Sequence, residues 1–268
     1  MNATERNQFD TAGYAGPFSL LSPGAARDIA NAVRRDVFSR PSPVPPQTKV
    51  KHRHLDSRAL YEICVREEVL DRAAAIHGGD LMLWNSTLFD KQGDLPGPLA
   101  YPWHCEAYYW EIEPLESVSF WIALDDARPD NGCMEFLPGS HRWNVPAIEG
   151  PDPRYAAWFV DRRADESAFS DAGRVSLAMT AGECVMFSER LLHRSGPNTA
   201  RAPRLGFAFR IAPSYVRVRH PFPCVIVRGL NRNRENAQAL PPQPESPASG
   251  AAALARSIRR HLRSLVGG

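Results

Sequence analysis

His104 and Glu106 lie two positions apart in the segment YPWHCE. Side chains two apart on an extended strand point to the same face, so these two could bind one metal ion. A third donor, His193, follows 89 positions later in SERLLHRSGP, too far away for a local zinc motif. Two histidines and one carboxylate form a facial triad that leaves three positions open on Fe(II). An isolated His-x-Glu pair is more often a surface feature, so this interpretation depends on the surrounding pattern.

Ser195 and Arg204, which both follow His193 in the sequence, are suited to binding a dicarboxylate. Ser195 lies two positions after this histidine, and Arg204 lies eleven positions after it. A dicarboxylate that chelates iron at one end needs an arginine and a hydroxyl at the other. Taken alone, Arg204 is equally consistent with a surface charge, and its weight comes from its place in the set. The other histidines that we interpret as exposed or structural are His52, His54, His141 and His220.

Short strands are predicted to position these residues. From Asp80 onwards, aromatic and β-branched segments are separated by Gly, Pro, Asn and Asp, a pattern typical of strands. The segments are LMLWNSTLF, SVSFWIAL, RVSLAMT, GECVMF and RLGFAFRI.

Two of these predicted strands alternate strictly between apolar and small or polar residues. One face holds Val118, Phe120, Ile122 and Leu124 in the first strand, and Leu205, Phe207, Phe209 and Ile211 in the second. The opposite face holds Ser117, Ser119, Trp121 and Ala123, and Arg204, Gly206, Ala208 and Arg210. We expect the apolar face to pack against helices or another sheet. The other face then lines a hollow barrel with room for an anionic ligand.

Helical signals precede the strands. Ser22-Pro23 reads as a helix start, and the apolar spacing continues to about Phe38. Ser57 begins a second helical region, which ends at His77-Gly78-Gly79. Helices first and strands later argue against a parallel α/β sheet and favour a sandwich or jelly-roll barrel. We therefore predict one mostly β domain over residues 1–230, with a helical part at 18–78 and a jelly-roll core at 79–220.

Several segments fall outside this pattern. Four prolines make residues 41–46 an irregular loop. Residues 150–173 are a charged and aromatic insertion, either a lid or an ordinary surface excursion. Residues 231–250 are a polar, proline-rich linker, and residues 251–268 an amphipathic helix with arginines on one face. We expect that helix to dock on its own domain or on a neighbouring subunit.

Composition excludes several classes of protein. The 268 residues are 43% hydrophobic and 23% charged, as in one soluble globular domain. A net charge of +2 provides no field suited to nucleic acid or acidic lipid. No apolar run approaches the ~20 residues that cross a bilayer, and MNATERNQFD lacks the regions of a secretory signal. Five scattered cysteines without a CxxC pair argue against a disulfide scaffold or a cysteine zinc site. We expect a cytoplasmic protein.

The motifs together resemble a known family. The segments WHCE, WIALDDARPDNGCMEFLPGSHR and AGECVMFSERLLHRSGPN, with the arginine that follows, are similar to the phytanoyl-CoA dioxygenase family over residues 80–215. Those proteins are Fe(II)- and 2-oxoglutarate-dependent oxygenases with a double-stranded β-helix core. YAGPFSLLSP, KHRHLD and the helix ending in IHGG extend the likeness over residues 13–220, towards the aliphatic chlorinases of that family. Those chlorinases act on amino acids bound to carrier proteins.

The resemblance implies roles for the residues of the set. His104, Glu106 and His193 would ligate iron. Arg204 and Ser195 would hold the distal carboxylate of 2-oxoglutarate.

Four further residues would complete the site. Trp121 on the inner face would flank the co-substrate, and Tyr101 would contact it. Asn131 in the NGC turn would shape the site rather than ligate the metal. Arg210 would either face the same cavity deeper in the barrel or serve the substrate, and the sequence leaves both open.

One position departs from the family. The usual motif is His-x-Asp, and this chain has Glu106, which offers the same oxygen ligand on a side chain one methylene longer. The chlorinases have a small residue there, which vacates a site for chloride. Glu106 therefore argues against chlorination, despite the N-terminal likeness.

The implied reaction consumes O2 and converts 2-oxoglutarate to succinate while it hydroxylates an unactivated C–H bond of a small metabolite in specialised biosynthesis. Desaturation or cyclisation stays open. Two alternatives remain: a halogenase or hydroxylase of a carrier-bound amino acid, and a jelly-roll module that binds a ligand without chemistry. Besides the small-molecule substrate, a carrier protein or a second copy of the chain are the candidate partners.

Overall fold

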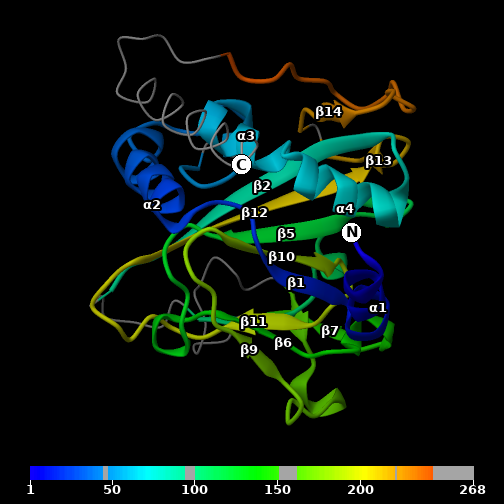
Figure 1. Ribbon diagram of the computed structural model, residues 1–268. Coiled ribbons are helices and arrows are strands. Elements are labelled where there is room, and N and C mark those ends of the chain that lie inside the picture. Colours follow the sequence, from blue (N-terminus) through cyan, green and yellow to red (C-terminus); the bar gives the residue numbers. More distant parts are fainter. Residues whose placement is uncertain (45–47, 94–99, 151–161, 221, 244–268) are drawn as a thin grey trace.

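Antiparallel strands build the centre of the molecule (Figure 1). The computed structural model describes residues 1–44, 48–93, 100–150, 162–220 and 222–243. A six-stranded sheet has the order β1 (Tyr14–Ser19), β10 (Glu183–Ser188), β5 (Val118–Ala123), β12 (Arg204–Pro213), β2 (Leu81–Lys91) and β14 (Val225–Arg228). A four-stranded sheet has the order β3 (Tyr101–His104), β11 (His193–Ser195), β6 (Met134–Phe136) and β9 (Val175–Leu177). Two short pairs join β13 (Arg217–Val218) to β4 (Ile112–Glu113), and β7 (Ala147–Ile148) to β8 (Arg163–Ala164). The predicted jelly roll is confirmed.

Helices lie against the large sheet on the side away from the smaller one (Figure 1). They include α2 (Pro23–Ala32), α3 (Arg58–Cys64) and α4 (Glu67–His77). The Ser22 hydroxyl accepts a hydrogen bond from the backbone N–H of Ala25 at 3.3 Å, as expected of a helix cap. A π-helical turn continues α2 to the cap at Phe38, so the predicted first helix is confirmed.

The predicted second helical region is two helices rather than one. It divides between Cys64 and Glu67, and Ser57 makes no capping hydrogen bond with its side chain. The apolar spacing runs through both helices, and for this reason the break is not visible as a change of periodicity.

The alternation in β5 and β12 has the predicted consequence. The apolar residues of both strands pack with Ile29, Leu60 and Leu70 of the helices in the main core. On the other face, Trp121 and Ala208 pack with Phe136 and other residues between the two sheets. One face of the large sheet therefore supports the helices, and the other is turned towards the smaller sheet.

The structure adds elements that the sequence patterns did not indicate. Helix α1 (Ala3–Ala12) begins with a reciprocal capping box between Asn2 and Glu5, and β1 pairs with β10 at the edge of the large sheet. Part of the segment predicted as a linker packs on the domain, because the Asn236 amide is buried and bonds the backbone of Val216 and Val218. Residues 151–161 of the predicted lid, and the whole of the predicted C-terminal helix, lie outside the described residues.

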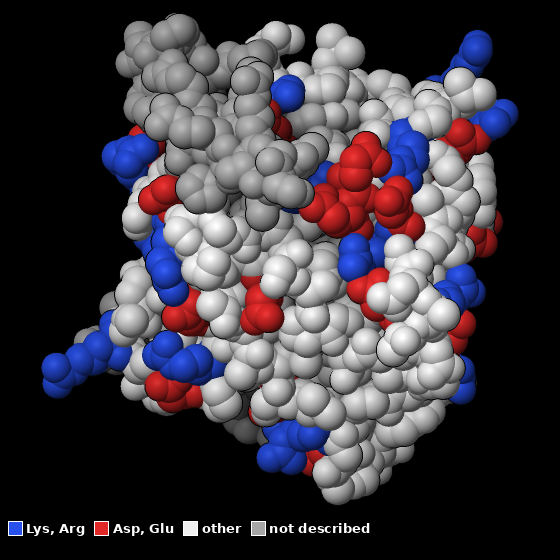
Figure 2. Space-filling view, in the orientation of Figure 1, with Lys and Arg blue, Asp and Glu red and all other residues white. Residues whose placement is uncertain are grey.

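The surface charge is mixed. Figure 2 shows basic and acidic side chains on the same face, and neither covers it. No helix in the described part of the chain is long and apolar enough to cross a membrane. All five cysteines belong to the described residues and are buried as free thiols, as expected.

Candidate active site

Two histidines face each other across neighbouring strands of the smaller sheet. His193 of β11 pairs with His104 of β3, and their ring centroids are 4.1 Å apart. Nδ1 of His104 lies 2.8 Å from the Pro102 carbonyl, and Nδ1 of His193 lies 2.9 Å from the Leu191 carbonyl. A carbonyl only accepts, so each Nδ1 carries the proton and each Nε2 carries the lone pair. The two rings are set up as neutral Nε2 donors for a metal.

Burial keeps both imidazoles neutral. It lowers the pKa of His104 to about 3 and also lowers the pKa of His193. Neutral imidazole is the form that binds a metal ion, so protons do not compete for these ligands near pH 7.

Glu106 does not share a strand with His104, contrary to our expectation. Strand β3 ends at His104, and Glu106 opens a 3-10 turn over Glu106–Tyr108. Its side chain nevertheless lines the same cavity as both histidines, because the turn folds it back inward. The chain direction changes at the end of the strand, which a two-residue spacing cannot reveal.

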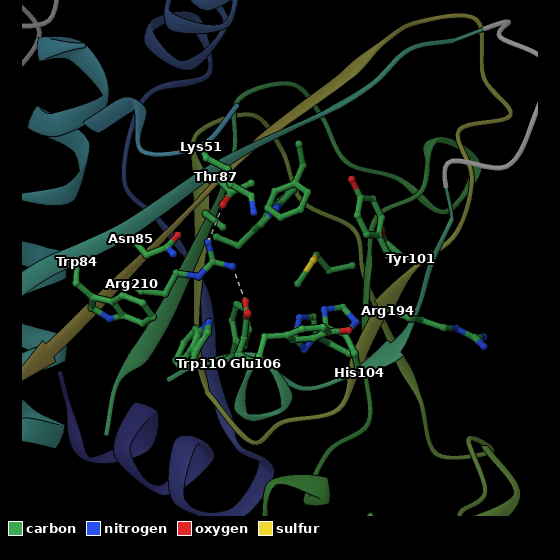
Figure 3. Close-up of a pocket in the computed structure, with 18 of the residues that line it drawn as sticks. Lys51, Trp84, Asn85, Thr87, Tyr101, His104, Glu106, Trp110, Arg194 and Arg210 are labelled. Carbon is green, nitrogen blue, oxygen red and sulfur yellow. Dashed lines mark hydrogen bonds and ion pairs between the residues drawn. The ribbon is translucent and has the colours of Figure 1, made fainter. Parts of the chain in front are cut away.

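The Glu106 carboxylate pairs with Arg210. Oε1 accepts a hydrogen bond from Nη2 of Arg210, and both side chains are buried (Figure 3). Burial opposes ionisation of Glu106, but the Arg210 guanidinium together with His193 and His104 more than offsets it, so the pKa of the carboxyl lies below its ordinary value. Within the described residues, no three His, Cys, Asp or Glu side chains are close enough together to hold a metal ion, and the Glu106 carboxylate bonds Arg210. Iron ligation by all three residues stays a prediction.

A cavity of about 390 Å³ joins these residues to the inner face of the large sheet (Figure 3). It is lined by every residue that we expected to act at the site: His104, Glu106, His193, Ser195, Arg204, Trp121 and Tyr101. Arg210 lines the cavity too, which is compatible with both of the roles left open for it.

Arg204 is a buried cation that forms no ion pair with any described residue. It is 1% exposed, Nη2 donates to the Gly132 carbonyl at 2.5 Å, and Nε has no hydrogen-bond partner among the same residues. In the described part of the chain no carboxylate forms an ion pair with it, and burial lowers its pKa to about 10. A neighbouring anion stabilises a buried charge of this kind, so this end of the cavity is suited to a carboxylate.

Trp121 lies against this cation, and its contact with the co-substrate stays a prediction. The Arg204 guanidinium is 5.3 Å from the ring centroid. The ring covers Gly206, where a Cβ would come within 2.1 Å of it. Gly206 therefore provides the space that lets the indole lie flat on the sheet.

Ser195 and Tyr101 are partners in the smaller sheet beside Arg204. Lys91, which the sequence analysis did not identify, lies opposite Arg204 in the large sheet and donates to the Ser195 carbonyl at 3.2 Å. Asn131 does not line the cavity. Its amide bonds the backbone of Arg128 and Asp126, which agrees with a role in shaping the turn.

The opposite end of the cavity was not identified from the sequence. It is lined by Lys51, Trp84, Asn85, Thr87, Trp110, His220 and Phe222. Asn85 and Thr87 pair with Arg210 and Ala208 of β12, so their inward direction could have been found from the alternation in β2. Lys51 and His220 come from loops without periodicity, and His220 is a cavity residue rather than merely an exposed or structural one.

Comparisons with known proteins identify the family and the fold. The family model for phytanoyl-CoA dioxygenase (PhyH) matches residues 9–206. The peroxisomal phytanoyl-CoA dioxygenase of Bos taurus is 24% identical over 204 residues, 74% of this chain and 60% of that protein. The chain thus spans about 60% of the length of this curated relative. Ectoine dioxygenase of Nocardia farcinica is 24% identical over 76% of this chain and 75% of that protein.

Solved structures show the same fold. The apo form of the non-heme monooxygenase ThoJ is 21% identical with a TM-score of 0.71, covering 96% of this chain and 95% of that chain. CytC3 with Fe(II) and α-ketoglutarate is 22% identical with a TM-score of 0.68, covering 91% of this chain and 98% of that chain. With the family model covering most of its length, the chain belongs to the phytanoyl-CoA dioxygenase (PhyH) family.

Proposed function

We propose that this protein is an Fe(II)- and 2-oxoglutarate-dependent oxygenase that hydroxylates an unactivated C–H bond of a small metabolite in specialised biosynthesis. One observation carries the proposal. A single cavity contains two neutral imidazoles, one carboxylate and, at Arg204, a buried guanidinium with no carboxylate of the described residues paired to it. The first three are the donors of a facial triad, and the guanidinium suits the far end of a dicarboxylate.

The side chains of the cavity offer the types of donor atom that Fe(II) binds. His104 and His193 would offer Nε2, because carbonyls hold their Nδ1 atoms. Glu106 would offer Oε2, since Arg210 bonds only Oε1. Bound Fe(II) would supply the activation of O2 that an unactivated C–H bond requires.

The residues of the cavity would bind the co-substrate, orient the Glu106 carboxylate and shield the reacting bond from water. Arg204 and Ser195 would hold the distal carboxylate of 2-oxoglutarate, with Tyr101 beside it and Trp121 as the flat wall. Arg210 would restrain Glu106 from behind, as buried partners of metal ligands commonly do. The aromatic side chains around the cavity exclude water from the reacting bond.

Chlorination and a purely binding role are less well supported. Glu106 fills the position that must lack a ligand for chloride to reach iron, and it brings a negative charge into the cavity. A binding module would have no need for two imidazoles held in the same tautomer beside a carboxylate.

Anaerobic titration tests the proposal. Fe(II) with 2-oxoglutarate should produce a weak visible charge-transfer band in the wild-type protein, and His193→Ala should abolish it. Absence of the band in the wild type would refute the proposal and favour a binding module. Succinate formation that rises with a candidate metabolite then identifies the substrate.

A further inference from the structure

Nearly all of the charged side chains that line the cavity have an ionic partner or an assigned ligand. Its permanently charged lining residues are Lys51, Arg194, Arg204, Arg210 and Glu106. Arg210 is paired with Glu106, and Arg204 is assigned to the co-substrate. Arg194 bonds Glu135 at 2.5 Å and, in Figure 3, points away from the cavity. Among the described residues Lys51 forms no ion pair, so it is the cation left over for a second ligand.

Lys51 and Arg204 lie at different positions along the large sheet, about 13 Å apart when measured along β12. The Lys51 backbone bridges Thr87 of β2, which pairs with Ala208 of β12, next to the Arg210 end. Arg204 and Arg210 are six residues apart on one face of β12, which corresponds to about 20 Å along the strand. Two cations therefore line the cavity at different positions along the sheet, Arg204 at one and Lys51 nearer to Arg210.

The loop that carries Lys51 is held rigidly on the sheet. His52 has a positive φ of 57°, a conformation that costs energy in a residue with a side chain. Its backbone N–H donates to the Ser86 carbonyl at 2.7 Å, and His54 Nδ1 lies 2.7 Å from the Ser86 hydroxyl. Arg53, fully buried, donates to the carbonyls of Val37, Arg40 and Lys49 and pairs with Asp56. This packing fixes the backbone at Lys51 beside the sheet, and the exposed Lys51 side chain lines the cavity.

Flat apolar side chains surround this end. Trp84 and Trp110 meet edge to face with centroids 5.0 Å apart, and the Trp84 indole N–H is already used by the Ser117 hydroxyl at 3.0 Å. Phe222 lies against His52 with centroids 4.3 Å apart. Asn85 and Thr87 are the polar side chains of the floor. An apolar wall with a few polar groups is typical of a small-molecule site.

We infer that the primary substrate is an organic acid with a single anionic group and a flat, apolar body. Lys51 receives the anion, and the Trp84, Trp110 and Phe222 side chains enclose the body. This inference rests on the proposed function, because it takes Arg204 as the co-substrate's partner. A cationic substrate is disfavoured, since the sole acidic side chain among the described lining residues is neutralised by Arg210.

A pair of probes of equal shape tests the class of substrate. Indole-3-acetate and indole-3-acetamide are titrated calorimetrically into anaerobic protein saturated with Fe(II) and 2-oxoglutarate, so that the Arg204 end is filled. We expect the acid to bind about tenfold more tightly than the amide, the usual worth of one charge-assisted hydrogen bond. Lys51→Gln should remove that preference. Lys49→Gln, an exposed lysine of the same loop outside the cavity, should retain it.

Two further measurements separate the parts of the inference. Trp110→Ala should weaken the binding of both probes by the same factor, because it removes an apolar side chain around the ligand and leaves the charge of Lys51 unchanged. The Kd of 2-oxoglutarate should be unchanged in Lys51→Gln. Equal binding of the two probes, no binding of either, or a preference that survives Lys51→Gln would overturn the inference. A higher Kd for 2-oxoglutarate in Lys51→Gln would also overturn the inference. Failure of 2-oxoglutarate to bind the wild-type protein would instead refute the proposed function.

Discussion

Replacing Arg204 by methionine should separate ligand binding from stability. The side chain is 1% exposed, and burial lowers its pKa from 12.5 to about 10. At about 1.4 kcal/mol for each pH unit, holding the charge inside the protein costs about 3 kcal/mol. The hydrogen bond to the Gly132 carbonyl returns about 1.5–3 kcal/mol of this cost. Methionine fills a similar volume, so the free energy of unfolding without co-substrate should change by only about 1 kcal/mol.

Binding of 2-oxoglutarate should respond much more strongly. A desolvated carboxylate that loses its charged partner is weakened by about 2–5 kcal/mol, which raises the Kd at least about 30-fold. Calorimetric titration measures the Kd, and urea unfolding measures stability. Arg217→Met, which removes an exposed guanidinium, is the matched control and should change neither quantity appreciably.

Two results would refute this reasoning. A loss of several kcal/mol of stability in Arg204→Met without co-substrate would show that the guanidinium is a structural group. An unchanged Kd for 2-oxoglutarate would place the distal carboxylate elsewhere, with Arg210 the next candidate.

The remaining predictions concern the metal, the co-substrate, the product and pH. His193→Ala should abolish succinate formation and weaken Mn(II) binding in calorimetry; wild-type turnover would disprove the triad. Ser195→Ala should raise the 2-oxoglutarate Kd about fivefold, the worth of one neutral hydrogen bond of about 1 kcal/mol, and no change would remove Ser195 from the site. Under 18O2 with excess chloride, the product should contain 18O and no chlorine, because Glu106 lines the cavity; a chlorinated product would mean that Glu106 does not bind the metal. Burial lowers the pKa of His54 to about 3. As the pH falls through 6.5, the His54 imidazole therefore binds a proton in the unfolded chain but stays neutral in the folded chain. The contribution of neutral His54 to the free energy of unfolding is therefore complete above pH 6.5 and is roughly 2 kcal/mol smaller at pH 5. In His54→Asn, the free energy of unfolding measured with urea should fall by correspondingly less between these two pH values.

The sequence by itself determined the large-sheet strands and their faces. In β5 and β12 the side chains alternate with a period of two, and burial of one face requires no knowledge of distant contacts. The same alternation placed Arg204, Trp121 and Arg210 on the inner face, where the structure has them. Helix starts such as Ser22-Pro23 were equally readable, because capping depends on neighbours within one turn.

Only the tertiary structure decided how the site is assembled. His104 and His193 meet because β3 and β11 pair, and two segments 89 positions apart carry no local signal of their register. Glu106 reaches the cavity from a 3-10 turn, and its partner Arg210 comes from the other sheet. Lys51 lines the cavity because contacts of His52 and His54 with Ser86 attach its loop to β2. Periodicity reports which side of an element is buried, but contacts between elements are set by the packing of the whole chain, which no local pattern encodes.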